Sequence, residues 1–342
     1  MNFEVAKLTG PRYSLRCLLF HDIADQVSEF TKGLGVTLGI GDFEATIKFI
    51  SKYYTPIGLQ EYLDHRRKGK LPARPVLVTF DDAYASVALN AAPLLRQYKI
   101  PAVFFVTASL VGNGELGLDN LLCYATNTSG FETVHAVARQ FAPRGDMEFA
   151  SLEQVFDNLL PVMSQEAIRK FRGALTSALG ISSEDIARRA KLYVSAEQLR
   201  ALAESGFEIA NHTFSHVFCR SLAGSDFEQE VYRNKTVLEA ITGSRIRAFS
   251  VPYGSPVDLT DELADHLHRS GHEVAFLARD RSNSLLTDPY RLNRINLHAG
   301  TDEDFFGQIE ILPRLRSLAD TLLRRNKGTG VGLSPGASRS TS

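Results

Sequence analysis

Short apolar runs of strand length alternate with stretches of helical periodicity along most of this chain. The apolar runs lie at residues 15–20, 76–80, 102–107, 207–210, 248–251, 273–277 and 294–297. The helical patterns lie between them, at residues 43–54, 59–67, 86–98, 195–205, 226–242 and 261–270. This alternation is typical of a parallel sheet whose strands are connected by helices. We therefore predict an α/β protein with a parallel sheet that is either open or closed into a barrel.

Residues 112–190 interrupt this alternation. They are mostly helical in pattern, with serines such as Ser164 and Ser183 at positions suited to helix N-termini. We interpret them as a helical insertion that forms either a lid or one wall of a cleft. Residues 302–325 are expected to form a closing helix, and the low-complexity segment 326–342 is expected to be disordered. Residues 1–325 then form a single domain.

The composition narrows the choice of partners and compartment. The chain has 38 Lys and Arg against 39 Asp and Glu, a net charge of −1, which argues against nucleic acid as a partner. The cysteines, Cys17, Cys123 and Cys219, have no metal-site spacing and are typical of reduced thiols. The N-terminus lacks the pattern of a signal peptide, and no apolar run is long enough to span a membrane. We expect a cytoplasmic protein, with the oligomeric state left open.

Titratable side chains follow several predicted strands at the point where each strand ends. His21 follows the first run, Asp81 and Asp82 follow the second, His212 follows the run at 207–210, and His298 follows the last. In parallel α/β folds, active sites gather at the carboxyl ends of the strands. Two adjacent carboxylates also repel each other unless a positive charge compensates them. The pattern therefore predicts a functional site at this end of the sheet.

His212 and His216 are four residues apart, so both imidazoles can face one way on a helical turn or on a loop that enters a helix. Such a pair alone is often incidental, and a catalytic zinc-type site needs about three protein ligands and an open position for water. The aspartate pair supplies a third ligand. In this interpretation Asp82 binds the metal, which offsets its charge, and Asp81 stays free as the general base for the metal-bound water.

Three motifs, TFDD (79–82), HTFSH (212–216) and FSVPYG (249–254), resemble in their order the polysaccharide deacetylases of carbohydrate esterase family 4, the NodB-homology fold. The flanking segments LRCLLFHDI, PLLRQYKIPAVFFV and LRALAESGFEIANHTFSH are also similar. The resemblance covers roughly residues 15–112 and 190–300. It implies a distorted (β/α) barrel of about seven strands. It also implies hydrolysis of N-acetyl groups on amino sugars with one divalent metal ion, commonly zinc.

The resemblance also implies roles for particular residues. Asp81 is the base, and the metal ligands are Asp82, His212 and His216. Tyr253 lends its backbone N–H to the oxyanion, Pro252 shapes that turn, and Thr213 braces the histidine loop by hydrogen bonding. The leaving amine needs a general acid, and the family uses a histidine for this, so His21 and His298 are the candidates. We favour His21, for which a structural hydrogen bond with Asp22 is the alternative.

The chain departs from the family pattern at several positions. Ala83 stands where glycine is common, Ser250 stands where an arginine often orients the base, and the chain has no tryptophan. Arg294 could reach in as a substitute, with a surface or structural ion pair as the alternative. The ligand set suits zinc, cobalt, nickel or iron, and we expect zinc.

We therefore expect a metal-dependent hydrolase that removes N-acetyl groups from an amino-sugar glycan or a sugar-conjugate precursor. One alternative is a hydrolase of a small non-sugar amide or imide that uses the same metal centre, because a fold does not determine its substrate. An alternative of another class is a carbohydrate-binding protein that has lost catalysis.

Overall fold

The computed structural model describes residues 13–143 and 147–328. Its centre is a parallel sheet with the strand order β10-β9-β8-β7-β6-β5-β1-β11, and β4 pairs with β5. The strands are β1 (Arg16–Phe20), β4 (Thr55–Pro56), β5 (Pro75–Phe80), β6 (Ala102–Val106), β7 (Glu208–Asn211), β8 (Ala248–Ser250), β9 (Val274–Leu277), β10 (Leu292–Asn293) and β11 (Ile295–Asn296). The predicted α/β class with a parallel sheet is thus confirmed.

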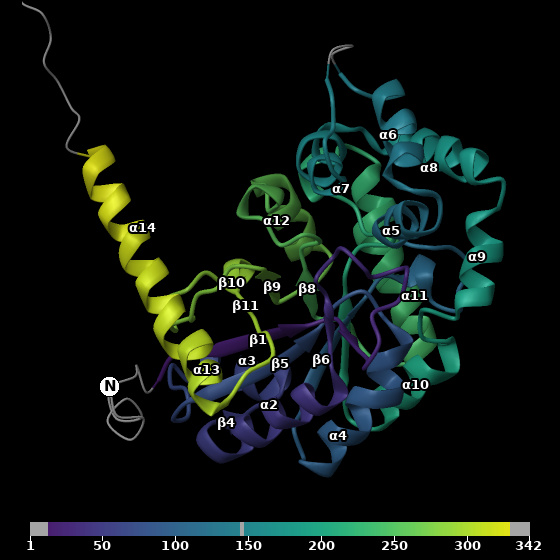
Figure 1. The fold of residues 1–342 in the computed structure, drawn as a ribbon. Coiled ribbons are helices and arrows are strands. Elements are labelled where there is room, and N and C mark those ends of the chain that lie inside the picture. Colours follow the sequence, from purple (N-terminus) through teal and green to yellow (C-terminus); the bar gives the residue numbers. More distant parts are fainter. Residues whose placement is uncertain (1–12, 144–146, 329–342) are drawn as a thin grey trace, which may run out of the picture.

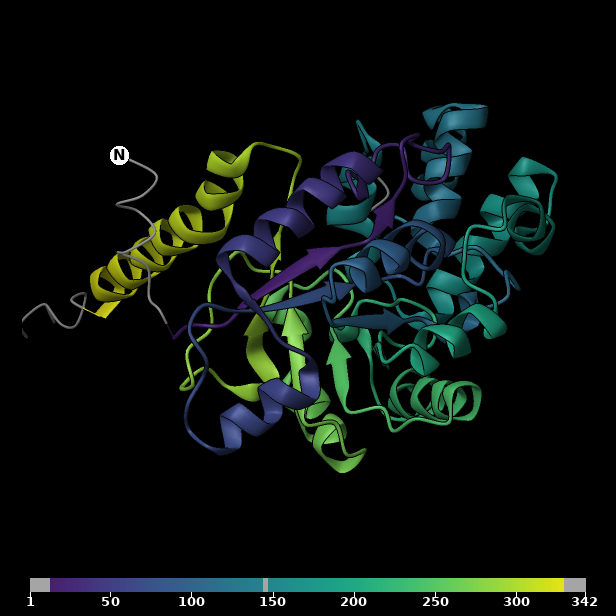
Figure 2. The same cartoon turned by 90° about the horizontal axis from the view of Figure 1, so that it is seen from below.

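One short segment closes the sheet into a barrel. β10 pairs with β9 at one end of the sheet, and β11 pairs with β1 at the other end. Only Arg294 separates these two strands in the sequence. The sheet is therefore a nearly closed barrel, which Figure 2 shows among its surrounding helices. The single strand expected at residues 294–297 is instead two short strands that are interrupted at Arg294.

Helices follow most of the strands and cover the barrel. They are α2 (Ile40–Tyr53), α3 (Leu59–Arg67), α4 (Ala92–Gln97), α10 (Ala196–Glu204), α11 (Arg233–Thr242), α12 (Asp261–Arg269), α13 (Asp302–Phe306) and α14 (Leu312–Gly328). Helix α14 reaches into segment 326–342, which was expected to be disordered, and residues 329–342 lie outside the described residues. Figure 1 shows α14 extending away from the barrel. No helix in the described ranges is long and apolar enough to cross a bilayer.

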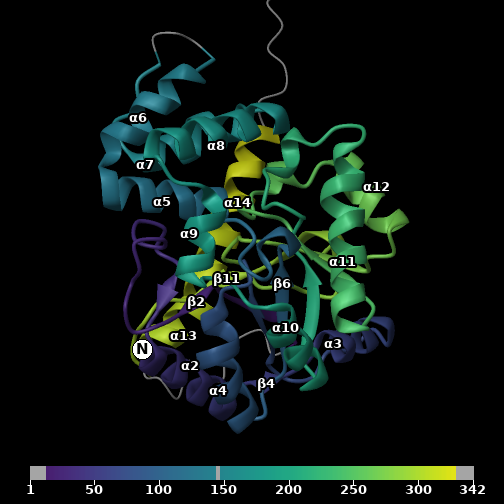
Figure 3. The same cartoon turned by 90° about the vertical axis from the view of Figure 1, so that its right-hand side faces the viewer.

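The predicted helical insertion forms a separate group of helices. They are α5 (Leu118–Ser129), α6 (Phe131–Gln140), α7 (Leu152–Gln154), α8 (Gln165–Leu179) and α9 (Ser183–Ala190). They gather on one side of the molecule, as the teal ribbons of Figures 1 and 3 show. Ser164 caps α8 as expected, whereas Ser182, and not Ser183, caps α9. In each case the serine hydroxyl accepts a hydrogen bond from a backbone N–H that the helix leaves unpaired.

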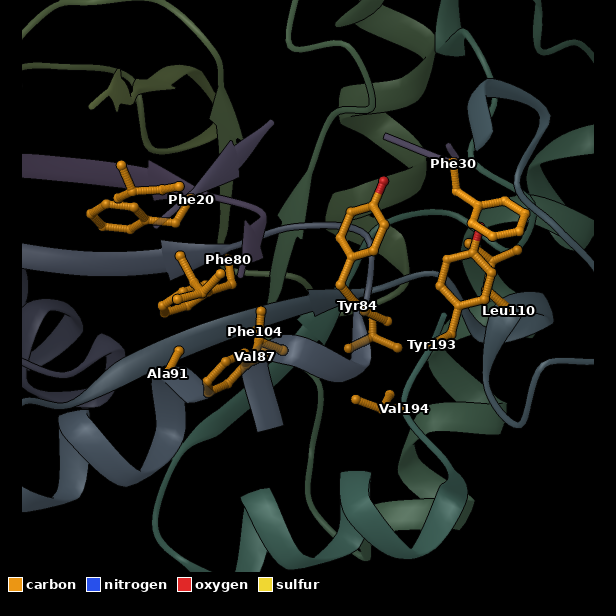
Figure 4. Packing of buried hydrophobic residues seen from close by; sticks show 14 of the residues in the cluster. Phe20, Phe30, Phe80, Tyr84, Val87, Ala91, Phe104, Leu110, Tyr193 and Val194 are labelled. Atoms are coloured by element: carbon orange, nitrogen blue, oxygen red, sulfur yellow. The ribbon is translucent and has the colours of Figure 1, made fainter. Parts of the chain in front are cut away.

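Aromatic side chains fill the core between the strands and the insertion. The Phe80 ring lies 5.5 Å from that of Phe20 and 4.9 Å from that of Phe104, on the neighbouring strands. Tyr84 and Tyr193 stack with centroids 5.9 Å apart and form a β-bridge. Figure 4 shows the phenylalanine rings and the two tyrosine rings, which belong to the same buried hydrophobic cluster. Because Tyr193 follows the insertion and Tyr84 follows β5, the end of the insertion is fixed against the turn that carries the two aspartates.

Candidate active site

The two adjacent aspartates, Asp81 and Asp82, lie in a sharp turn that follows β5. Asp82 and Ala83 have φ angles of 73° and 63°, in the left-handed region that non-glycine residues seldom adopt. The Asp81 N–H donates to the Phe20 carbonyl at 3.0 Å, and the Val194 N–H donates to the Ala83 carbonyl at 3.0 Å. The turn is therefore held from both sides. Asp81 pairs most closely with Arg294, whereas Asp82 lies nearest to the two histidines, and the His212 Nε2 atom is within 3.7 Å of Asp81 as well.

Asp81 forms a buried ion pair with Arg294. The Arg294 Nη1 and Nη2 atoms lie 2.6 and 2.7 Å from the two carboxylate oxygens of Asp81. Ser250 completes the group, because Arg294 donates to its hydroxyl at 2.7 Å and that hydroxyl donates to Asp81 at 3.1 Å. Both charged side chains are almost fully buried. Arg294 therefore does not form the surface ion pair that we considered, and it contacts the predicted base directly.

The surroundings of Asp81 favour its ionised form. Burial raises the pKa of this carboxyl, but the charges of Arg294 and His212 outweigh burial and hold the pKa below its ordinary value. An ionised carboxylate in a fixed orientation can accept a proton.

Asp82, His212 and His216 form a cluster that fits a divalent cation. One potential ligand atom from each residue lies within 4.8 Å of the others. The Asp82 Oδ1 atom is 3.3 Å from the Nε2 atoms of both histidines. This oxygen is buried and has no hydrogen-bond partner in the described part of the chain. A buried carboxylate oxygen of this kind needs a partner, and two imidazoles with one carboxylate are typical zinc ligands.

Hydrogen bonds at the far side of each imidazole orient the two histidines. The His212 Nδ1 atom lies 2.9 Å from the Ser250 carbonyl oxygen. Because a carbonyl oxygen only accepts, the His212 Nδ1 carries the hydrogen and its Nε2 lone pair faces the cluster. The His216 Nδ1 atom lies 3.1 Å from the Asp119 carboxylate, which favours the same arrangement. Both histidines thus have the second contact that metal-binding histidines usually make.

Carboxylates on both sides also change the proton affinity of His216. Burial lowers the pKa of His216, but Asp82 and Asp119 outweigh burial and raise it to about 9. A cation bound at this cluster has to displace that proton, so metal binding and proton release are coupled.

The loop that carries the two histidines has its own supports. Thr213 and His216 have φ angles of 61° and 55°. The Thr213 N–H donates to Asn211 at 3.0 Å, and the Thr213 hydroxyl accepts from the Val217 N–H at 3.4 Å. Buried Glu230 accepts from the backbone and hydroxyl of Ser215, at 2.9 and 2.6 Å. Thr213 therefore makes a bracing contact of the kind expected, and sequence reasoning missed Glu230.

The turn after β8 places Tyr253 beside the cluster. Pro252 begins this turn, and Tyr253 and Gly254 follow with φ angles of 60° and 64°. A Cβ atom added to Gly254 would lie 2.2 Å from the Ala278 Cβ atom, so only glycine fits there.

The Tyr253 ring stacks on Phe218, with centroids 3.7 Å apart, and lies 4.8 Å from the His216 ring. The hydroxyl of Tyr253 donates to Asp119 at 2.8 Å. The aromatic side of the cleft is thus linked to a residue of the insertion.

The site lies in a cleft of about 910 Å³. The insertion contributes Leu152, Phe156 and Pro161 to its lining, and His21 lies in the same cleft. His298 lines a neighbouring hollow of about 160 Å³, which His21 also touches. The structure thus brings His21, but not His298, into the cleft that holds the cluster.

His21 does not form the structural hydrogen bond with Asp22 that was the alternative to a catalytic role. The Asp22 carboxylate accepts from Thr37 at 2.8 Å and from Ser86 at 2.6 Å, and not from His21. Burial lowers the pKa of His21, although the charges of Asp82 and Asp81 oppose this effect. The role of His21 as the general acid stays a prediction.

The sequence of the chain matches a known family of proteins. The family model described as polysaccharide deacetylase matches residues 68–275, more than half of the chain. The chain therefore belongs to the polysaccharide deacetylase family.

Among individual proteins, the chain is similar to poly-β-1,6-N-acetyl-D-glucosamine N-deacetylases. The protein from Staphylococcus aureus is 39% identical over 71 residues, which are 20% of this chain and 24% of that protein. The protein from Staphylococcus epidermidis is 28% identical over 142 residues, 39% of this chain and 49% of that protein. The chain thus spans half or less of the curated relatives that it matches.

Solved structures share the fold at low sequence identity. The Streptococcus pyogenes deacetylase PplD, in complex with acetate, has a TM-score of 0.60 and 14% identity over 87% of this chain and 99% of that one. IcaB from Ammonifex degensii has a TM-score of 0.55 and 20% identity over 87% of this chain and 97% of that one. These likenesses confirm the predicted deacetylase-type barrel.

Proposed function

We propose that this protein is a metal-dependent hydrolase that removes N-acetyl groups from an amino-sugar polymer. The observation that carries the proposal is a single cleft that holds both the buried pair of Asp81 with Arg294 and the cluster of Asp82, His212 and His216. Membership of the polysaccharide deacetylase family supports this chemistry. The names of the relatives support a polymer of β-1,6-linked N-acetylglucosamine as the substrate class.

In the proposed mechanism, Asp82, His212 and His216 hold one divalent ion, which we propose is zinc. When bound, such an ion supplies Lewis-acid polarisation of the amide carbonyl. Asp81, kept ionised by Arg294, takes a proton from the attacking water.

Two further groups complete the reaction. The backbone N–H of Tyr253 donates to the amide oxygen as negative charge develops on it. His21 donates a proton to the leaving nitrogen, so that acetate and a free amine are formed.

Features of the cleft weigh against the two alternatives. A cleft of about 910 Å³ is near the upper end of small-molecule sites, and this argues for a saccharide chain over a small amide or imide. A protein that had lost catalysis would have no need of a base held by a buried arginine. Arg294 occupies that position although Ser250 replaces the usual arginine of the motif.

An assay of substrate hydrolysis by metal-stripped protein, with and without added zinc, tests the proposal. The substrates are β-1,6- and β-1,4-linked N-acetylglucosamine oligomers, assayed by acetate release, and a small cyclic imide, assayed by ring opening. Asp81→Asn is the control variant. We expect zinc-dependent release from the β-1,6 oligomers and none from the control. Zinc-dependent turnover of the imide alone would favour the small-amide alternative, and glycan binding without any turnover would favour the binding protein.

The cytoplasmic location stays a prediction from the sequence. Fractionation of the source cells, followed by immunodetection of the protein, tests it directly.

A further inference from the structure

Asp119 contacts two separate parts of the candidate site although it belongs to the insertion. It lies in the first turn of α5. Its Oδ2 atom is 3.1 Å from the His216 Nδ1 atom, and its Oδ1 atom accepts from the Tyr253 hydroxyl at 2.8 Å. Its side chain is 15% exposed, so water competes little for these contacts. One carboxylate thus joins a candidate metal ligand to the residue assigned to the oxyanion.

The contact with His216 determines which nitrogen faces the metal cluster. A neutral imidazole carries one N–H, and a carboxylate at Nδ1 favours the hydrogen on that nitrogen. The Nε2 lone pair of His216 is then directed at the position next to Asp82, whose Oδ1 atom lies 3.3 Å away. Without Asp119, the imidazole has no such preference between its two nitrogens.

The contact with Tyr253 fixes a strained segment. Tyr253 has a φ angle of 60°, which costs free energy in a non-glycine residue. The bond from its hydroxyl to Asp119 and the stacking on Phe218 hold the ring from two directions. The backbone N–H at this position is therefore held in place through the side chain.

The start of α5 is itself fixed to the protein core. The amide of Asn120, next to Asp119, donates to the Tyr84 hydroxyl at 2.9 Å and accepts from the Tyr193 hydroxyl at 2.5 Å. Leu118 and Leu121 are buried on either side. Asp119 is thus carried on a rigid segment and not on a loop that opens freely.

We propose that Asp119 is a positioning residue through which the insertion completes the metal centre. This proposal rests on the proposed function, because it takes Asp82, His212 and His216 as the metal ligands. It assigns the insertion to a fixed wall of the site. A lid that opened as a whole would have to break the hydrogen bonds of Asp119 to both His216 and Tyr253.

Binding of cobalt(II) and zinc to Asp119→Asn tests the proposal without any substrate. The variant keeps the shape of the side chain and removes its charge. We expect 10- to 100-fold weaker binding in a chelator competition, the usual effect of losing such a partner of a metal-bound histidine. The visible absorption bands of the cobalt protein should shift, because the orientation of His216 changes. Glu184→Gln, which alters an exposed carboxylate of the same insertion that does not line the cleft, is the matched control and should bind cobalt as the wild type does.

Two further variants keep the test decisive. Tyr253→Phe removes only the second hydrogen bond of Asp119 and should change cobalt affinity less than about 3-fold, against the 10- to 100-fold effect at His216. Asp119→Ser replaces Asp119→Asn if circular dichroism shows that the latter is unfolded. Wild-type affinity and an unchanged cobalt spectrum in a folded Asp119 variant would overturn the proposal. Equal losses of cobalt affinity in Tyr253→Phe and Asp119→Asn would overturn the claim that Asp119 acts directly through His216.

The result is separable from the proposed function. If the wild-type protein binds cobalt but releases no acetate from any glycan, the proposed function fails while the cobalt comparison still decides the role of Asp119.

Discussion

Replacing Arg294 by methionine should both destabilise the protein and weaken its proposed base. Methionine is unbranched and similar in length, so the change removes the charge and the hydrogen bonds with little loss of volume. Asp81 then stays buried, with only 4% of its side chain exposed, without the guanidinium that contacts both of its oxygens. Removing one partner of a buried ion pair costs about 3–5 kcal/mol of folding free energy.

The same substitution should move the pH dependence of catalysis. Arg294 is the largest of the influences that lower the pKa of Asp81, and burial, which raises the pKa, remains after the substitution. Loss of a neighbouring arginine raises the pKa of a carboxyl. The acidic limb of the kcat/KM profile should therefore shift to higher pH.

Urea unfolding and a pH profile of acetate release measure the two effects. Far-ultraviolet circular dichroism is the suitable probe of unfolding, because the chain has no tryptophan. Asp81→Asn and the double variant complete a thermodynamic cycle, and the double variant should be more stable than the summed single effects predict, by about 0.5–3 kcal/mol. Strictly additive free energies together with an unmoved acidic limb would refute the coupling of Arg294 to Asp81.

Three further predictions concern other residues. His21→Asn should lower kcat for acetate release by about 10²–10⁴-fold, and His298→Asn should lower it far less; equal losses would contradict the choice of His21 as the acid. Equilibrium dialysis should find that Asp82→Asn loses zinc whereas Asp81→Asn keeps zinc and loses turnover, and loss of zinc from both would refute the separate roles of the two aspartates. Burial lowers the pKa of His272 to about 3, so its contribution to stability is fully present above the unfolded pKa of about 6.5 and is lost as pH falls. Protonation of this histidine in the unfolded state should lower the free energy of unfolding by about 2 kcal/mol at pH 5. Urea unfolding of His272→Gln should therefore show a smaller loss of stability between pH 7 and pH 5 than the wild type does.

The main strands and the central residues of the site were predictable because their signals are local. A run of buried apolar residues predicts a strand wherever it lies, and the motifs at 79–82, 212–216 and 249–254 each follow such a run. Carboxyl ends of parallel strands meet at one edge, so Asp82 and His212 were expected to lie close together although they are far apart in sequence.

Contacts that depend on tertiary packing were not predictable in the same way. The bonds of Asp119 to His216 and Tyr253 join residues that are 97 and 134 positions apart, and no motif surrounds Asp119. The partner of His212 is the backbone carbonyl of Ser250, which no side-chain pattern indicates. The interruption of the last strand at Arg294 also results from barrel closure, because one segment has to pair with both ends of the sheet.

Backbone strain shows how the barrel and the insertion depend on each other. Nine non-glycine residues of the described chain have positive φ angles, and five of them surround the site: Asp82, Ala83, Thr213, His216 and Tyr253. Each left-handed residue costs roughly 1–2 kcal/mol and persists only where its surroundings hold it. Val194, just after the insertion, bonds to the turn at Ala83, and Asp119, inside it, bonds to His216 and Tyr253. Since the insertion and its end contact three of the strained segments, the barrel alone would lack these three restraints on the conformation of the site.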